Sequence, residues 1–263
     1  MKNILLLVHE DPGQFSRLQV ALAIVRTLRG HLLCVEVKSI PVLTSDGYTG
    51  LPDALITQQL REPSAMRTRL ETLLVQENVS WSFTETFGSN ASALDDVSEL
   101  ADLIVLSTHH EPVPGHRRHP EALPIEARRP MLAVPPGCQG LDTRGCVTVA
   151  WDGSRPCNEA MRAGVPLLKS ARKVVLLEIN QPGGVFAMTE AARYLSRHGI
   201  PAELCGRSTG GPVASAILEH ARQCHADMIV MGAYGVPRAE QAIFGGTTRT
   251  ILMEAEVPLL LAH

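Results

Sequence analysis

The feature that most restricts the fold of this chain is a repeat that gives its two halves the same order. Residues 101–106 read Ala-Asp-Leu-Ile-Val-Leu, and residues 226–231 read Ala-Asp-Met-Ile-Val-Met. In the same way, Arg-Pro-Met-Leu-Ala-Val at 129–134 corresponds to Val-Pro-Leu-Leu-Leu-Ala at 257–262. A spacing of about 125 residues is too long for a solenoid, so the repeat indicates a duplicated domain.

Within each half, apolar runs alternate with segments of helical periodicity. The first half predicts strands at 3–8, 31–37, 79–87, 103–107 and 131–134, and helices at 14–29, 54–77 and 91–100. The second half predicts strands at 146–151, 173–179, 201–207, 228–231 and 257–262, and helices at 156–171, 185–198, 212–224 and 247–256. This alternation is typical of right-handed βαβ units, so we expect an α/β fold with a doubly wound parallel sheet of five strands in each half.

A linker separates the two halves. Residues 135–145 are rich in proline and glycine, which predicts one domain over residues 1–137 and a second over residues 145–263. The last strand of each domain is an apolar edge that needs cover. We therefore expect these two edges to pair, so that one chain forms a pseudo-dimer; whether two chains form a homodimer stays open.

Composition argues against several classes of partner. The net charge of −3 gives no reason to expect nucleic acid. No apolar run is long enough for a membrane span, and the run at 4–8 is too short for a signal peptide, so we expect a cytoplasmic protein. The six cysteines form no Cys-x-x-Cys pair, which favours reduced thiols, and Cys34 is expected to be a small buried apolar residue.

Two glycine turns near the end of the chain suggest a pocket. The apolar run at 228–231 leads into Gly232 and Gly235, which allow close approach of a ligand or a positive φ. Gly245 and Gly246 form the second turn. The helix that follows would offer free backbone N–H groups to an anion. The residues alone leave two interpretations open, a phosphate site or glycines that only separate a strand, a loop and a helix.

The start of that helix is predicted at Thr247 or Thr248, either of which can act as its N-cap. The surrounding residues fit neither of the two common phosphate motifs. No Gly-Lys-[Ser/Thr] occurs here, which excludes a Walker A loop, and the spacing of the glycines is not Gly-x-Gly-x-x-Gly.

The two halves, the Asp-Gly-Ser at 152–154 and the pattern Gly-x2-Gly-x9-Gly from Gly232 resemble the universal stress protein family in its tandem form. The resemblance covers essentially the whole chain and is stronger over 145–263. It implies the adenine-nucleotide α-hydrolase-like fold, with strand order 3-2-1-4-5 and pairing of domains through the last strand. It also implies ATP or AMP, with or without Mg²⁺, at the switch point between strands one and four.

Transferred onto this sequence, the family's site falls on nine residues: Asp152, Ser154, Ile179, Gly232, Gly235, Gly245, Gly246, Thr247 and Thr248. The Asp152 carboxylate would accept hydrogen bonds from ribose hydroxyls, and the backbone of Ile179 would contact adenine. The glycines and threonines would hold the ribose-phosphate. Ser154 is expected mainly as the cap of the helix that follows it.

The sequence departs from the family pattern at several positions. Gly246 stands where the family has Ser or Thr, so we expect phosphate binding to lose one hydrogen bond, about 0.5–1.5 kcal/mol. In the first half, His9 stands in place of Asp, and Ser-Thr-His-His at 107–110 replaces Gly-Ala-Tyr-Gly. The first half is therefore not expected to bind nucleotide in the family's way.

Four histidines, His109, His110, His116 and His119, could suggest a metal site, but the intervening Pro and Gly residues favour a solvated, pH-responsive loop without metal. No Gly-x-Ser-x-Gly turn or other catalytic motif is present. The expected function is a stress-response regulator that binds an adenine nucleotide in its second domain and is not an enzyme, although slow ATP hydrolysis stays open. The alternatives are a nucleotide-independent interaction module with vestigial pockets, or an enzyme of the wider fold group.

Overall fold

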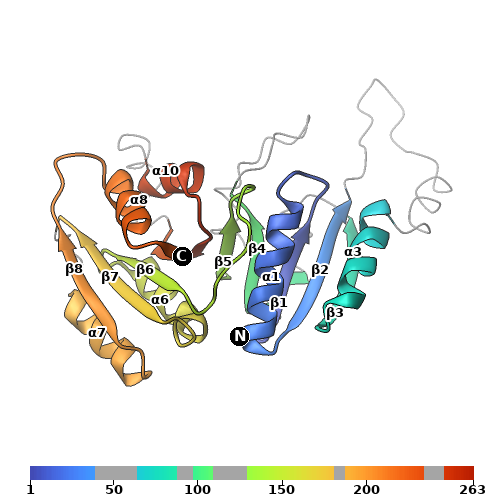
Figure 1. The fold of residues 1–263 in the computed structure, drawn as a ribbon, viewed down its shortest axis with the longest axis horizontal. Coiled ribbons are helices and arrows are strands. Elements are labelled where there is room, and N and C mark those ends of the chain that lie inside the picture. Colours follow the sequence, from blue (N-terminus) through green and yellow to red (C-terminus); the bar gives the residue numbers. More distant parts are fainter. Residues whose placement is uncertain (39–63, 88–96, 109–128, 181–186, 234–245) are drawn as a thin grey trace, which may run out of the picture.

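The computed structural model describes residues 1–38, 64–87, 97–108, 129–180, 187–233 and 246–263 (Figure 1). Its strands form one sheet of ten strands in the order β3-β2-β1-β4-β5-β10-β9-β6-β7-β8. Counted within each half, both sets of five strands have the order 3-2-1-4-5. The predicted α/β fold with two doubly wound parallel sheets is therefore confirmed.

The first half follows the predicted pattern over most of its described length. Its elements are β1 (Asn3–Val8), α1 (Gln14–Leu28), β2 (His31–Lys38), α3 (Ala65–Gln76), β3 (Ser80–Phe87), β4 (Leu103–Ser107) and β5 (Met131–Val134). Residues 54–63 of one predicted helix and 91–96 of another lie outside the described residues. Ser64 caps α3, because its side chain accepts a hydrogen bond from the backbone N–H of Arg67.

The second half repeats the order of the first. Its elements are β6 (Cys146–Trp151), α6 (Arg155–Leu168), β7 (Lys173–Ile179), α7 (Met188–Arg197), β8 (Ala202–Arg207), α8 (Val213–Gln223), β9 (Ala226–Gly232), α10 (Thr247–Glu254) and β10 (Leu259–Ala262). The prediction that Thr247 or Thr248 caps the last helix is wrong. Gly246 is the N-cap, with no side-chain bond, because the helix begins at Thr247.

The two halves join through their last strands. β5 and β10 pair antiparallel, with Leu260 opposite Leu132, whereas the other strand pairs are parallel. Both leucines are fully buried. The Ser16 hydroxyl of α1 also donates a 2.7 Å hydrogen bond to the carbonyl of Pro136 in the linker. The predicted pseudo-dimer within one chain is thus confirmed, and association of two chains stays a prediction.

The described helices divide between two hydrophobic layers. Buried residues of α1, α3, α6 and α7 share one cluster with alternate strand residues, and those of α8 and α10 belong to the other. Cys34 on β2 is fully buried, as expected, and burial raises the pKa of its thiol to about 12. All six cysteines are free. No helix in the described ranges is long and apolar enough to cross a membrane.

Leu260 lies at the centre of the joint between the halves, so its truncation should weaken the whole fold. We expect Leu260→Ala to lower the free energy of unfolding by about 2–5 kcal/mol in urea titrations, because a buried cavity replaces its side chain. The control is Leu204→Ala on the edge strand β8, where the leucine is 47% exposed. Equal losses for both variants would show that the joint does not stabilise the fold.

Candidate functional site

The candidate site lies where β6 and β9 end. These strands are parallel neighbours, with Ala150 beside Met231, so Asp152 and Gly232 lie at the same edge of the sheet. Asp152 is exposed, and its Oδ1 accepts a 2.9 Å hydrogen bond from the backbone N–H of Ser154. In 3-2-1-4-5 sheets this edge, between strands one and four, is where ligands bind.

A buried thiol lies between the two strand ends. Burial raises the pKa of Cys157 to about 12, and the nearby carboxylate of Asp152 adds to the rise. The backbone N–H groups of Asp152 and Gly232 lower the pKa of the same thiol. Both residues therefore lie beside the Cys157 sulfur atom. The Cys157 thiol donates to the carbonyl of Ala150 at 3.2 Å. The structure therefore brings Asp152 and Gly232 together, as the sequence predicted.

Gly232 has a packing reason to be glycine. A Cβ at this position would lie 2.5 Å from the backbone nitrogen of Cys157 and 2.8 Å from the carbonyl carbon of Pro156. The end of β9 thus touches the first turn of α6 directly. Close contact between strand and helix, which sequence analysis did not consider, is sufficient to require glycine here.

The turn after β6 holds Asp152 in place. Gly153 has a φ of 68°, which glycine adopts without strain. Ser154 is the N-cap of α6, and its hydroxyl accepts a 3.3 Å hydrogen bond from the backbone N–H of Cys157. The expectation that Ser154 caps this helix is confirmed. Because the cap and the Asp152 bond fix both ends of the turn, the exposed carboxylate is held at the sheet edge.

The end of β7 forms another part of this edge. Ile179 is 6% exposed and pairs in register with Arg207 of β8. Asn180 follows in the left-handed conformation, with a φ of 62°, and its side-chain oxygen accepts from the backbone N–H of Thr209 at 2.7 Å. Sequence analysis missed Asn180, although asparagine is the residue that most often takes this conformation besides glycine.

Gly246, the N-cap of α10, has room around it among the described residues. Apart from its chain neighbours, none of them has an atom within 4 Å of the position that a Cβ would take, and its φ of −57° suits any residue. Thr247 and Thr248 lie in the first turn, where backbone N–H groups lack acceptors within the helix. Gly235, Gly245 and the histidines at 109, 110, 116 and 119 lie outside the described residues.

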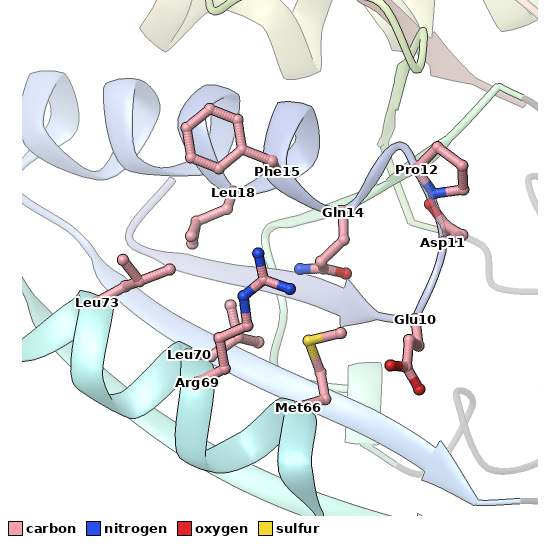
Figure 2. Close-up of a pocket in the computed structure, with 10 residues that line it drawn as sticks. All are labelled: Glu10, Asp11, Pro12, Gln14, Phe15, Leu18, Met66, Arg69, Leu70 and Leu73. Carbon is pink, nitrogen blue, oxygen red and sulfur yellow. The ribbon is translucent and has the colours of Figure 1, made fainter.

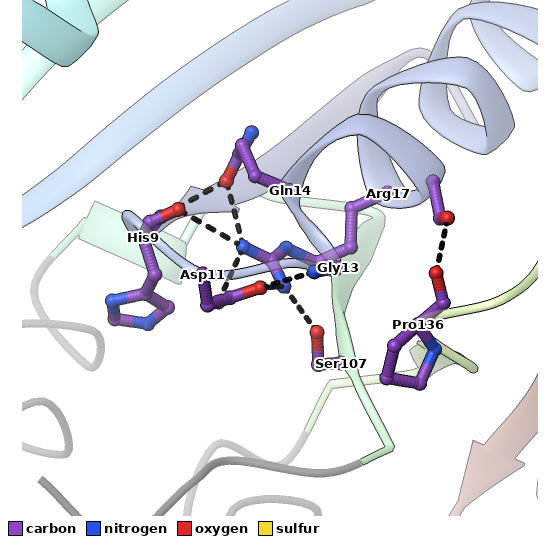
Figure 3. Close-up of polar contacts among 8 residues, drawn as sticks. His9, Asp11, Gly13, Gln14, Arg17, Ser107 and Pro136 are labelled. Carbon is purple, nitrogen blue, oxygen red and sulfur yellow. Dashed lines mark hydrogen bonds and ion pairs between the residues drawn. The ribbon is translucent and has the colours of Figure 1, made fainter.

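In the first half, a buried arginine takes the corresponding place between β1 and β4 (Figure 3). Arg17 is fully buried, and its guanidinium donates to both carboxylate oxygens of Asp11 at 2.9 Å and to Gln14 Oε1 at 2.7 Å. It also contacts the hydroxyl of Ser107 and the carbonyl of His9. Ser107 ends β4 where Gly232 ends β9, so the serine that replaces glycine is a partner of Arg17.

The Arg17 cluster fills the first-half crevice with the protein's own charges. This arrangement supports the expectation that the first half does not bind nucleotide in the family's way. The sequence carried a signal for the cluster that was missed, since Arg17 falls beside Leu18 at the start of a helix rich in buried apolar residues. A charged side chain at such a position needs a partner, and Asp11 is the nearest acid that its guanidinium reaches.

Comparison with known proteins finds a match to a family model. Residues 201–263 match the model of the universal stress protein family. A universal stress protein of Synechocystis sp. is 26% identical over 176 residues, which cover 64% of this chain and 60% of that protein. The chain thus spans less than two thirds of the length of this curated relative.

Solved structures resemble the chain over nearly its whole length. A universal stress protein from Archaeoglobus fulgidus has a TM-score of 0.74 at 16% identity, with 99% of this chain and 95% of that one covered. A functionally unknown protein from Pseudomonas aeruginosa has a TM-score of 0.58 at 15% identity, with 99% and 92% covered. At such low identities these likenesses show the shared two-domain fold.

Two glycines of the site should respond differently to substitution. We expect Gly232→Ala to lower the free energy of unfolding by about 1–3 kcal/mol, because the new methyl group would overlap the backbone of α6. Gly246→Ser should be neutral or stabilise by a few tenths of a kcal/mol, roughly, because serine is a good N-cap and the space is open. Urea unfolding measures both, and a tolerated Gly232→Ala would contradict the packing argument.

The Arg17 cluster can be tested by removing its cation. Arg17→Met would leave Asp11, Gln14 and Ser107 without their shared donor, at an expected cost of about 3 kcal/mol in stability. Arg26→Met is the control, because Arg26 pairs with Glu77 at the surface and its side chain is 46% exposed. That pair is worth about 1 kcal/mol or less. Thermal and urea unfolding should show a larger loss of stability for Arg17→Met than for Arg26→Met.

Proposed function

We propose that this chain is a universal stress protein, that its second half binds an adenine nucleotide and that the protein acts as a regulator in the stress response. One observation supports the site above all others. Asp152 and Gly232 meet at the ends of two neighbouring parallel strands, beside the same Cys157 sulfur. This edge is the switch point of the sheet, where folds of this type bind ligands.

The proposed contacts match the chemistry of a nucleotide. The exposed carboxylate of Asp152, held by the Ser154 backbone, can accept hydrogen bonds from ribose hydroxyls. The end of β7 at Ile179 supplies backbone groups for adenine. The first turn of α10, at Thr247 and Thr248, supplies N–H groups for phosphate. ATP and AMP both fit this scheme, with Mg²⁺ as an accompanying ion for ATP.

One nucleotide per chain is expected. In the first half the same position holds the buried guanidinium of Arg17, already bonded to Asp11, Gln14 and Ser107. A nucleotide phosphate or ribose would have to displace these partners. The first half then serves as the structural partner of the second through the pairing of β5 with β10.

Binding rather than catalysis suits the reactive groups at this edge. Cys157 is a potential nucleophile beside Asp152, yet burial raises its thiol pKa to about 12. At neutral pH the sulfur is therefore protonated and a poor nucleophile. Ribose binding explains the exposed Asp152 carboxylate without giving it a catalytic role.

A second function, a nucleotide-independent interaction module, is favoured by a specific observation. Packing against α6 is sufficient to explain Gly232, and Gly246 lacks the hydroxyl that the family pattern places there. On this hypothesis the pocket is vestigial, and the ten-stranded scaffold is the functional product.

Calorimetry separates the two functions. We expect wild-type protein to bind one ATP or AMP per chain, and Asp152→Ala to weaken binding about 10- to 100-fold, since a charged acceptor is lost. Gly246→Ser should strengthen binding about 2- to 10-fold by restoring one hydroxyl.

The matched control is Glu159→Ala, which removes the same charge from an exposed position on α6. It should bind nucleotide as the wild type does. Absence of binding at millimolar ATP, together with an Asp152→Ala variant that behaves like the wild type, would favour the interaction module.

A further inference from the structure

A cavity lies in the first half, between α1 and α3 (Figure 2). Its volume is about 380 Å³, within the range of roughly 300–1,000 Å³ typical of small-molecule sites. Residues that matter for its chemistry come from both helices: Gln14, Leu18, Met66, Arg69, Leu70 and Leu73. The cavity lies on the sheet face covered by α1 and α3, whereas α10 of the proposed nucleotide site packs on the other face.

Most of the cavity wall is apolar. Leu18 and Leu70 are each 2% exposed and form its floor, while Met66 and Leu73 pack against the same hydrophobic cluster from α3. Methionine adapts its shape to a ligand, because its side chain is unbranched and flexible. Such walls favour a ligand with an aliphatic body.

An unpartnered polar group faces this apolar space. Gln14 is 7% exposed, and its Oε1 accepts from the backbone N–H of His9 at 2.9 Å and from Arg17 at 2.7 Å. These two donors fix which end of the amide is oxygen. The Nε2 points into the space between the helices (Figure 2), where no described residue accepts a hydrogen bond from it. A buried donor without an acceptor costs about 1–3 kcal/mol, so an acceptor from a ligand would be stabilising.

A positive charge lies beside the same space. The guanidinium of Arg69 on α3 is directed toward Gln14 in Figure 2, and it forms no ion pair with any residue that the structure describes. The acidic residues at the cavity do not neutralise the positive charge of Arg69. Both carboxylate oxygens of Asp11 are bonded to Arg17, and the exposed Glu10 carboxylate is directed away from Arg69.

We propose that the cavity between α1 and α3 binds a small aliphatic carboxylate. The carboxylate accepts from Gln14 Nε2 and from the Arg69 guanidinium, and its hydrocarbon chain packs on Leu18, Leu70 and Leu73. A single negative charge matches one cation and one amide donor, whereas a doubly charged phosphate would need more donors than this apolar wall supplies. The site is in the half that lacks the proposed nucleotide pocket, so it does not depend on the nucleotide hypothesis.

The test uses the full chain with octanoate and, as its uncharged analogue, 1-octanol, both below micelle-forming concentrations. Methyl NMR of ¹³C-methionine-labelled protein follows Met66, which lines the cavity. We expect saturable binding of one octanoate per chain with a shift of the Met66 methyl signal. Arg69→Gln should weaken octanoate binding about 5- to 10-fold and leave octanol binding unchanged.

Two further variants complete the design. Arg197→Gln removes the same charge from an exposed position on α7 and should bind octanoate as the wild type does. Leu73→Trp should fill the cavity and abolish binding of both probes. The proposal is overturned if octanoate shows no saturable binding, if octanol binds as tightly as octanoate, or if Arg69→Gln and Leu73→Trp both bind like the wild type.

Discussion

The structure depends on the antiparallel pairing of two buried edges. Within each half the strands are parallel, and their last members, β5 and β10, are wholly apolar and four residues long. Neither edge could remain exposed without inviting association with another chain. Leu260 opposite Leu132 closes both edges at once and turns two five-stranded sheets into one of ten. This joint fixes how the two halves, and with them their crevices, are oriented relative to each other.

The duplication lets one crevice remain open while the other is filled. In the second half, Gly232 allows α6 to approach the strand end, and Asp152 stays exposed. In the first half, Ser107 replaces that glycine, and its hydroxyl becomes one of several partners of the buried Arg17. Because Arg17 neutralises Asp11 and orients Gln14, the same cluster also sets the polar end of the α1–α3 cavity. Arg17 and its partners thus account both for the filled crevice of the first half and for the neighbouring Gln14 Nε2, which has no acceptor among the described residues.

Sequence patterns predicted the strands well because buried parallel strands are continuous apolar runs, as at β4 and β9. They also predicted that Asp152 and Gly232 would meet, since parallel neighbours end at one edge. Helix ends were less predictable: Thr247 or Thr248 was expected as the cap of the last helix, yet Gly246 takes that position and α10 begins at Thr247. The Arg17 cluster was missed, because Ser107 lies 90 residues from Arg17 in the sequence and only folding brings it to the guanidinium that Asp11 and Gln14 share.

By itself, the sequence determined the duplicated α/β architecture, the strand order through its family resemblance, and the capping of α6 by Ser154. These depend on local periodicity and on residues close together in the chain. Only the tertiary structure decided that Gly232 is required by the backbone of Cys157, that Arg17 occupies the first crevice, and that Gln14 Nε2 and Arg69 border one cavity. The physical reason is that steric fit and the matching of buried donors to acceptors act between atoms far apart in sequence.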